Sequence, residues 1–223
     1  MQYRIALILC LLCLSNTLHA EREAFTLPNG DRYEGDFVDG VLSGSGVYEW
    51  ADGDRYEGQF SNDLPSGTGT YFWADGRRYD GEFVAGKRQG YGSLTWVNGD
   101  RYEGAFLANQ MHGEGTFLWG NGDRYEGDFI ANQRYGAGSM LWRGGQRYEG
   151  DFADDTMHGQ GIYRWPDGRL FKGSFIGGRR TGVGIFAATD GTLFRGFFAD
   201  DQRHGLVVKQ LSNGERFFEG YSA

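Results

Sequence analysis

The chain has 223 residues, 39 of them glycine, and a formal net charge of −8. Like charges repel, so an acidic chain argues against binding to nucleic acid or to anionic lipid by simple electrostatic attraction. Glycine inside a helix costs about 1 kcal/mol relative to alanine, so this glycine content argues against helix throughout the chain.

Residues 1–20 differ in composition from the rest of the chain. Arg4 supplies a positive charge, residues 5–14 form an apolar run, and residues 15–20 are polar and end in the small side chain of Ala20. This order is typical of a secretory signal peptide, with cleavage expected after Ala20. At about 1.5 Å per residue the apolar run covers only about half of a ~30 Å hydrocarbon core, so we expect no membrane-spanning anchor.

The predicted mature chain, residues 21–223, contains no cysteine, because Cys10 and Cys13 lie in the leader. Removing Arg4 with the leader takes the formal charge from −8 to −9. We expect an exported protein, periplasmic or extracellular. A cysteine-free exported chain fits a bacterial envelope better than a eukaryotic secretory route.

One heptapeptide, Asp-Arg-Tyr-Glu-Gly-Asp-Phe, occurs at residues 31–37 and again at 123–129, and related segments recur every 23 residues. Its aromatic position falls at Tyr33, Tyr56, Tyr79, Tyr102, Tyr125, Tyr148, Phe171, Phe194 and Phe217. A tryptophan recurs at the same period, at Trp50, Trp73, Trp96, Trp119, Trp142 and Trp165. A fixed period of this length predicts a repeat architecture, here an array of nine repeats over residues 21–223.

Each repeat contains a step such as Asp52-Gly53 between two aromatic runs, which is the strongest short-range signal for a β-hairpin. Polar and apolar residues alternate on both sides of the step, so Tyr48 and Trp50 share one face of the predicted sheet, and Arg55 and Glu57 share a face. We therefore predict one hairpin per repeat, with a glycine-rich loop leading to the next repeat.

The segment from Tyr102 to Phe106, Tyr-Glu-Gly-Ala-Phe, is followed by a polar loop and by Met-His-Gly-Glu-Gly at 111–115. This pattern resembles the MORN repeat, and the resemblance extends over residues 24–223. It implies an all-β fold, an elongated single-layer antiparallel sheet of stacked β-hairpins. It also implies a scaffold for protein contacts and, in some members, attachment at membranes.

In such an array each repeat packs mainly on its neighbours, so the terminal repeats need caps. Both ends are degenerate. Glu21 and Glu23 stand at the glycine-pair positions of the first repeat, and Val207 and Leu211 replace a glycine and the tryptophan in the last.

Residue types that carry chemistry occur only at repeated positions. His112, His158 and His204 lie 46 residues apart, which places them about 19 Å apart at ~4.8 Å per strand, too far to share a metal ion. The resemblance makes this histidine a loop-packing residue. The pairs Asp154/Asp155 and Asp200/Asp201 lie in equivalent loops. Catalysis needs one asymmetric constellation, so we expect no enzyme activity, no catalytic residue, no metal site and no cofactor.

The polar face carries an arginine and an acidic residue two positions apart, as in Arg101 and Glu103. The simplest interpretation is a solvated face of paired charges, each pair contributing about 0–1 kcal/mol. Repeats seven and eight break this pattern at Leu170, Lys172, Leu193, Arg195 and Phe197, and Ala188 takes the tryptophan position. The change is either sequence drift near the C-terminal end or a partner-binding patch, since exposed apolar residues rimmed by charge mark interfaces.

Three functions remain as hypotheses. The first is a non-enzymatic exported scaffold that binds a protein partner. The second is a glycan-binding module that stacks sugars on the Tyr/Trp row, which requires exposed rings. The third is a membrane-associated adaptor, which requires a basic or amphipathic element that the sequence does not offer. The sequence identifies neither the partner nor the oligomeric state.

Overall fold

The computed structural model describes residues 21–221, and all regular structure among them is β-strand. The chain forms two compact parts, an N-terminal part that ends at Gln110 and a C-terminal part that begins at Met111. The N-terminal part contains β1 (Glu21–Thr26), β2 (Arg32–Val38), β3 (Val41–Glu49), β4 (Arg55–Ser61), β5 (Leu64–Phe72), β6 (Arg78–Val84), β7 (Lys87–Thr95) and β8 (Arg101–Leu107).

The C-terminal part continues with β9, whose first residue precedes the boundary. Its strands are β9 (Gln110–Leu118), β10 (Arg124–Ile130), β11 (Gln133–Leu141), β12 (Arg147–Ala153), β13 (Thr156–Arg164), β14 (Leu170–Ile176), β15 (Arg179–Ala187), β16 (Leu193–Ala199), β17 (Gln202–Gln210) and β18 (Arg216–Tyr221). Among the residues that are described, no helix is long and apolar enough to cross a membrane.

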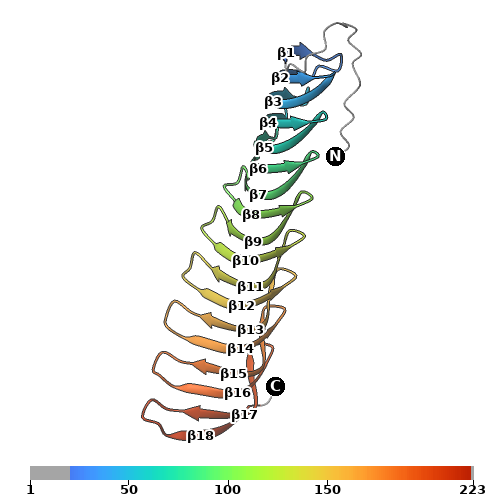
Figure 1. The fold of residues 1–223 in the computed structure, drawn as a ribbon. Coiled ribbons are helices and arrows are strands. Elements are labelled where there is room, and N and C mark those ends of the chain that lie inside the picture. The colour runs from blue at the N-terminus through green and yellow to red at the C-terminus, as the bar shows by residue number, and fades with distance from the viewer. Residues whose placement is uncertain (1–20, 222–223) are drawn as a thin grey trace. The chain divides into compact units, whose positions relative to one another are not determined.

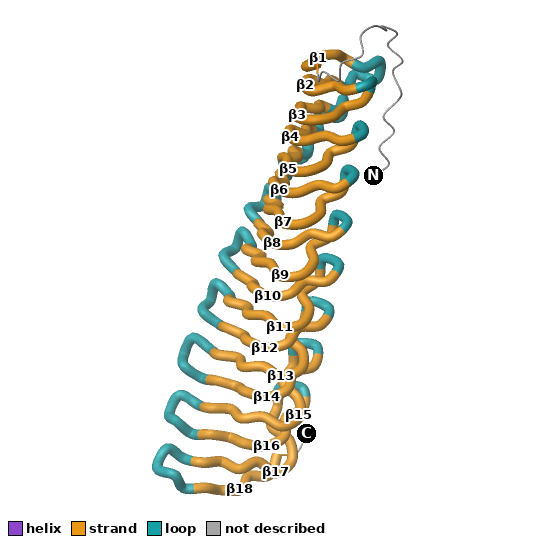
Figure 2. Tube along the Cα trace, viewed as in Figure 1, coloured by secondary structure: helices purple, strands orange, loops and turns teal. Residues whose placement is uncertain are grey.

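Within each part, consecutive strands pair antiparallel and form one layer of hairpins that follow one another in chain order (Figures 1 and 2). The repeat sets the register, because the aromatic position of one strand lies opposite a large apolar residue on its neighbours in the regular repeats. Tyr56 pairs with Tyr48 on one side and with Tyr71 on the other. The predicted all-β fold, a single-layer antiparallel sheet of stacked hairpins, is confirmed.

Two kinds of tight turn alternate along the chain. At the predicted Asn-Gly step, the Trp96 amide donates to the Asp100 carbonyl (2.9 Å) and Gly99 has φ +86°. This is a three-residue hairpin loop with its glycine in the left-handed region. The other turn has only two residues with positive φ, such as Asn62 (φ 50°) and Asp63 (φ 66°).

The predicted glycine-rich loop between repeats was therefore wrong. The two-residue turn connects the strands there, and the Gly-x-Gly pairs lie inside strands, as Gly90 and Gly92 do in β7. The reason is steric. Gly92 pairs with Gly81 of β6, and a Cβ atom on either would come within 2.5 Å of the Tyr79 side chain. The fully buried Tyr79 ring covers both glycines, which explains why they recur.

The buried rings form a continuous edge-to-face series within each part. Phe83 lies between Tyr56 (centroids 5.1 Å apart) and Tyr79 (5.2 Å), and both contacts are T-shaped. In the C-terminal part, Phe152 lies in the same way between Tyr125 (4.9 Å) and Tyr148 (5.2 Å). Such aromatic pairs contribute about 0.5–1.5 kcal/mol beyond the area they bury. Each phenylalanine thus couples its own repeat to the preceding one.

Several strand pairings, including that of β6 with β7, contain an irregularity next to the glycine pair. After Gly81 pairs with Gly92, the register shifts so that Phe83 pairs with Arg88. The Tyr79 hydroxyl donates to the Glu82 carbonyl (3.1 Å), and the Glu82 carboxylate accepts the Tyr91 amide (2.9 Å). The tyrosine and the acidic residue therefore satisfy backbone groups that the shift would otherwise leave unpaired.

We expect Gly138→Ala to destabilise the protein. The new Cβ would come within 2.5 Å of Cε2 of Tyr125, a ring that is fully buried, so the added methyl overpacks the core at a cost of about 1–3 kcal/mol. Gly220→Ala in β18 is the matched control, because no atom lies within 4 Å of its Cβ position. Urea unfolding measures both free energies, and equal losses would contradict a ring packed over the glycines.

We also expect stability to depend on position in the array. Trp119→Ala removes a ring that packs 4.5 Å from Phe117 and lies under the Arg134 guanidinium (5.6 Å), and should cost about 3–5 kcal/mol. Phe217→Ala removes a ring that is already 45% exposed, so its cost should be much smaller. Denaturant melts that give equal losses would mean that stability is not a sum over neighbouring repeats.

Candidate functional site

The five residues predicted to bind a partner lie together in the C-terminal part. β15 pairs with β14 on one side and with β16 on the other. Ile185 of β15 thereby joins Lys172 to Arg195, and Ala187 joins Leu170 to Leu193. Residues that pair across strands share a face of the sheet. Leu170, Lys172, Leu193, Arg195 and Phe197 therefore occupy the face opposite to the buried rings, which we call the outer face.

Sequence reasoning missed three apolar residues that extend this group. Val183 pairs with Phe197, and Leu206 and Phe218 follow on β17 and β18. The exposed fractions are 74% for Val183, 47% for Phe197, 66% for Leu206 and 73% for Phe218. The signal was present, because Val183 and Leu206 stand where Ser45 and Thr68 stand in earlier repeats. We call the whole set the C-terminal patch: Leu170, Lys172, Val183, Leu193, Arg195, Phe197, Leu206 and Phe218.

The C-terminal patch also differs from earlier repeats in its electrostatics. In those repeats the outer-face arginine pairs with the carboxylate two positions on, as Arg101 does with Glu103 (2.9 Å) and Arg147 with Glu149 (2.7 Å). Neither Lys172 nor Arg195 forms an ion pair with any residue in the described range 21–221. The patch therefore presents two exposed cations whose charge is not neutralised locally.

Phe197 stands at a repeat position where other repeats have a side chain that accepts a backbone hydrogen bond. At the same repeat position Asp36 accepts the Ser45 amide (2.8 Å), and Asp151 accepts the Gln160 amide (3.0 Å). A phenyl ring cannot accept such a hydrogen bond, which contributes about 0.5–1.5 kcal/mol. Phe197 thus gives up a local hydrogen bond and exposes an aromatic ring, which stability alone does not explain.

The ring face offers no open aromatic row along the regular repeats. The tyrosines at the repeated aromatic position are at most 2% exposed: Tyr33, Tyr56, Tyr79, Tyr102, Tyr125 and Tyr148. Arginines cover the half-buried tryptophans, as Arg88 does over Trp73 (5.5 Å) and Arg134 over Trp119 (5.6 Å). Burial raises the pKa of Tyr79 to about 12, so its hydroxyl stays protonated near neutral pH and cannot serve as a base. These buried tyrosines therefore offer no exposed ring face on which a sugar could stack.

The repeated histidines lie in strands, and the aspartate pairs lie in two-residue turns where the second aspartate accepts a backbone hydrogen bond. His112, His158 and His204 lie in strands β9, β13 and β17, each shortly after a two-residue turn. Asp155 in one such turn accepts the Arg134 amide (3.0 Å), and Asp201 accepts the Arg180 amide (3.0 Å). Residues 21–221 contain no group of three or more His, Cys, Asp or Glu side chains able to hold a metal ion.

Sequence reasoning also missed the role of the aspartate that precedes the repeated Arg-Tyr. Asp31 accepts the Tyr48 hydroxyl (2.7 Å) and the Ala51 amide (2.8 Å). Burial raises the pKa of Asp31, but these hydrogen bonds outweigh it and leave the pKa below its usual value. Asp54 likewise accepts the Tyr71 hydroxyl (2.6 Å) and the Ala74 amide (2.9 Å). These carboxylates tie one three-residue turn to the next.

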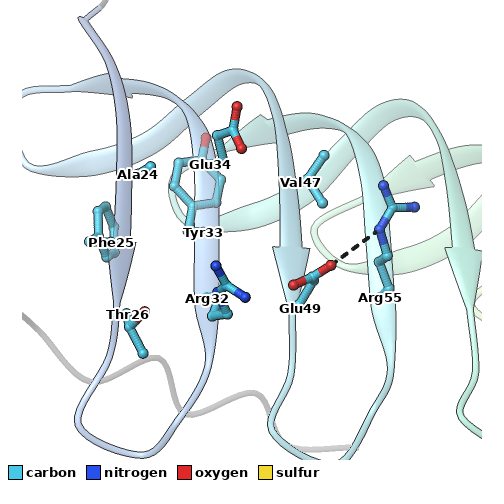
Figure 3. A pocket seen from close by; sticks show the side chains of 9 residues that line it. All are labelled: Ala24, Phe25, Thr26, Arg32, Tyr33, Glu34, Val47, Glu49 and Arg55. Atoms are coloured by element: carbon cyan, nitrogen blue, oxygen red, sulfur yellow. Dashed lines mark ion pairs between the residues drawn. The ribbon is translucent and has the colours of Figure 1, made fainter.

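A hollow of about 520 Å³ lies at the N-terminal end, between β1 and β4 (Figure 3). Most of its charged side chains are paired: Arg55 lies 3.6 Å from Glu49 and 2.9 Å from Glu57, and Glu34 lies 3.9 Å from Arg22. Arg32 also lines this hollow and forms no ion pair within residues 21–221.

Comparison with curated proteins found no match. Among solved structures, the TCP domain of Drosophila melanogaster SAS-4 in complex with a proline-rich motif of Ana2 is 12% identical with a TM-score of 0.42, covering 95% of this chain and 99% of that one. The G-box domain of the microcephaly protein CPAP is 15% identical with a TM-score of 0.42, covering 91% and 100%. A TM-score below 0.5 supports no conclusion about function.

The family model of the MORN repeat matches eight consecutive segments. They are residues 33–55, 56–77, 79–101, 102–124, 125–147, 148–168, 171–193 and 194–216. These segments begin at the aromatic positions from Tyr33 to Phe194, and the ninth position, Phe217, lies beyond them. The match covers most of the chain in the phase that the 23-residue period predicts, and the chain belongs to the MORN-repeat family.

Proposed function

We propose that the mature chain is a non-enzymatic, exported scaffold that binds an acidic protein partner through the C-terminal patch. One observation carries this proposal: two unpaired cations, Lys172 and Arg195, lie on the outer face among exposed apolar side chains such as Val183 and Phe197. MORN repeats are scaffolds for protein or membrane interaction, and the patch gives this array one asymmetric surface.

The chemistry of the patch suits a protein. Exposed apolar side chains rimmed by charge are typical of protein interfaces, and aromatic residues often supply most of the binding energy. Phe197 is the natural anchor, because its ring is exposed between Val183 and the imidazole of His204 (6.3 Å). A partner with an apolar anchor and flanking carboxylates would neutralise Lys172 and Arg195. The mature chain carries −9, so carboxylates are repelled elsewhere on its surface.

The two alternatives fit the surface less well. A cation near an anionic membrane contributes about 1 kcal/mol, so two cations on a chain of this net charge give weak attachment. A glycan needs exposed ring faces, and the tyrosine row is buried. No repeated residue forms the asymmetric constellation that catalysis needs.

The proposal of export rests on residues 1–20, which lie outside the described residues. Their charge, apolar run and small final residue support a cleaved leader.

We expect the double variant Leu193→Glu with Phe197→Ser to lose the partner. The glutamate introduces a charge of the wrong sign beside Arg195, and the serine removes the anchor. Tagged parent and variant are compared in pull-downs from the protein's own envelope fraction, after circular dichroism shows that both are folded. A partner recovered with the parent should fall at least tenfold with the variant and should elute from the parent at high salt.

The control for this experiment is Leu141→Glu, which places a glutamate on the same outer face in β11 at another exposed leucine. It should recover the partner as the parent does. If the folded double variant keeps every partner of the parent, the patch is only terminal drift.

We expect the mature protein to begin at or near Glu21 and to fractionate outside the cytoplasm. N-terminal sequencing of protein purified from its native cells identifies the first residue. A variant without residues 1–20 should remain in the cytosol, because it lacks the leader. An intact Met1 on soluble cytosolic protein would refute export.

A further inference from the structure

A hollow of about 510 Å³ interrupts the ring face of the C-terminal part, among β15–β18. It combines aromatic rings with arginines. The residues that matter here are Trp165, Phe186, Tyr221, Arg169, Arg180 and Arg203.

The hollow lies beside the place where a repeated indole is missing. In regular repeats the tryptophan packs on the aromatic residue two positions before it, with centroids 4.6 Å apart for Tyr71 and Trp73. Phe186 has Ala188 at that position instead. The Ala188 turn is otherwise normal, because its amide donates to the Thr192 carbonyl (2.9 Å) as in the other repeats. The backbone is thus unchanged. Phe186 still contacts Trp165 (centroids 5.8 Å apart) and Phe194 (6.2 Å) but lacks the indole two positions on.

Of the three arginines that line this hollow, Arg203 alone lies outside an ion pair among residues 21–221, although its charge acts at longer range on the Glu219 carboxylate. Arg180 pairs with Asp201 (2.9 Å), and Arg169 pairs with Asp167 (2.7 Å). Arg203 forms no ion pair with any of residues 21–221. The nearby Glu219 carboxylate pairs with Lys209 (3.1 Å) and accepts the Tyr221 hydroxyl.

The Arg203 guanidinium is also held in place. Its Cζ atom lies 4.1 Å from the ring centroid of Phe194 and 4.6 Å from that of Tyr221. A guanidinium stacked on rings keeps its edge N–H groups free, and this planar fork matches a carboxylate. Stacking reduces the side-chain freedom that would be lost when an anion binds. Arg203 is therefore preorganised for an oxyanion that the described chain does not supply.

We propose that the hollow binds a carboxylate attached to an aromatic ring. The ring takes the place of the missing indole against Phe186 and Trp165, and the carboxylate pairs with Arg203. A free aromatic acid and an aromatic residue beside a carboxylate in a peptide offer the same chemistry. This site lies on the ring face, so it stands independently of the C-terminal patch on the outer face.

In the test, four probes are titrated separately into the mature chain. Binding is measured by NMR from the shifts of the tryptophan indole N–H and arginine Nε–H signals. The probes are N-acetyl-tryptophan, its neutral amide, acetate, and an amidated peptide with an internal Asp-Trp pair. N-acetyl-tryptophan should bind at least tenfold more tightly than its amide or acetate. A peptide that binds more tightly than N-acetyl-tryptophan points to a peptide ligand, and the reverse order points to a free acid. Equal affinities for the acid and the amide would refute the site.

Two variants locate the binding. Ala188→Trp restores the repeat and should fill the space, so binding falls at least tenfold. Arg203→Gln should lower the affinity for N-acetyl-tryptophan at least tenfold and leave the affinity for its neutral amide unchanged. Arg134→Gln is the control at the same repeat position, where Trp119 is present under the arginine and Asp155 already pairs with it (3.1 Å). Thermal melts check that each variant is folded. Parent-like binding by Ala188→Trp, or a parent-like preference for the acid in Arg203→Gln, would overturn the proposal.

Discussion

The packing of one tyrosine ring across a pair of glycines is the constraint on which the rest of the structure depends. The Tyr79 ring lies over Gly81 and Gly92, and neither position has room for a Cβ atom. With the ring held there, its hydroxyl reaches the Glu82 carbonyl, and its faces and edges meet Phe83 and Phe106. Glycine content, register and contact between repeats all follow from this arrangement.

The same arrangement places different constraints on the two faces of the sheet, the ring face and the outer face. The ring face supplies the core, so its side chains vary little from repeat to repeat. The outer face only has to remain solvated, which paired charges such as Arg101 and Glu103 achieve at little energetic gain. A change there costs little stability, and for this reason an asymmetric surface such as the C-terminal patch can arise without disturbing the array.

Most polar side chains that could carry chemistry are already engaged in holding the backbone. Asp31 joins neighbouring turns, and Asp155 holds the Arg134 amide. A repeated residue is therefore best judged by what its equivalents bind. By that measure Lys172 and Arg195 stand apart because they replace the acidic residue of earlier repeats. Arg203 stands apart because it lacks the ion pair that Arg134 and Arg180 form with Asp155 and Asp201. Both proposed sites depend on this difference between equivalent positions rather than on any residue type.

The sequence by itself determined the repeat, its 23-residue period, the hairpins and the fold class, because spacing and alternation are local properties that survive in every copy. It also identified Leu170, Lys172, Leu193, Arg195 and Phe197 as departures from the pattern. Only the tertiary structure showed that Val183, Leu206 and Phe218 extend that surface, and that the glycine pairs lie in strands. It alone showed that Arg203 stacks between two rings beside a hollow. These features depend on cross-strand register and on which side chains meet in space, and a linear pattern contains neither.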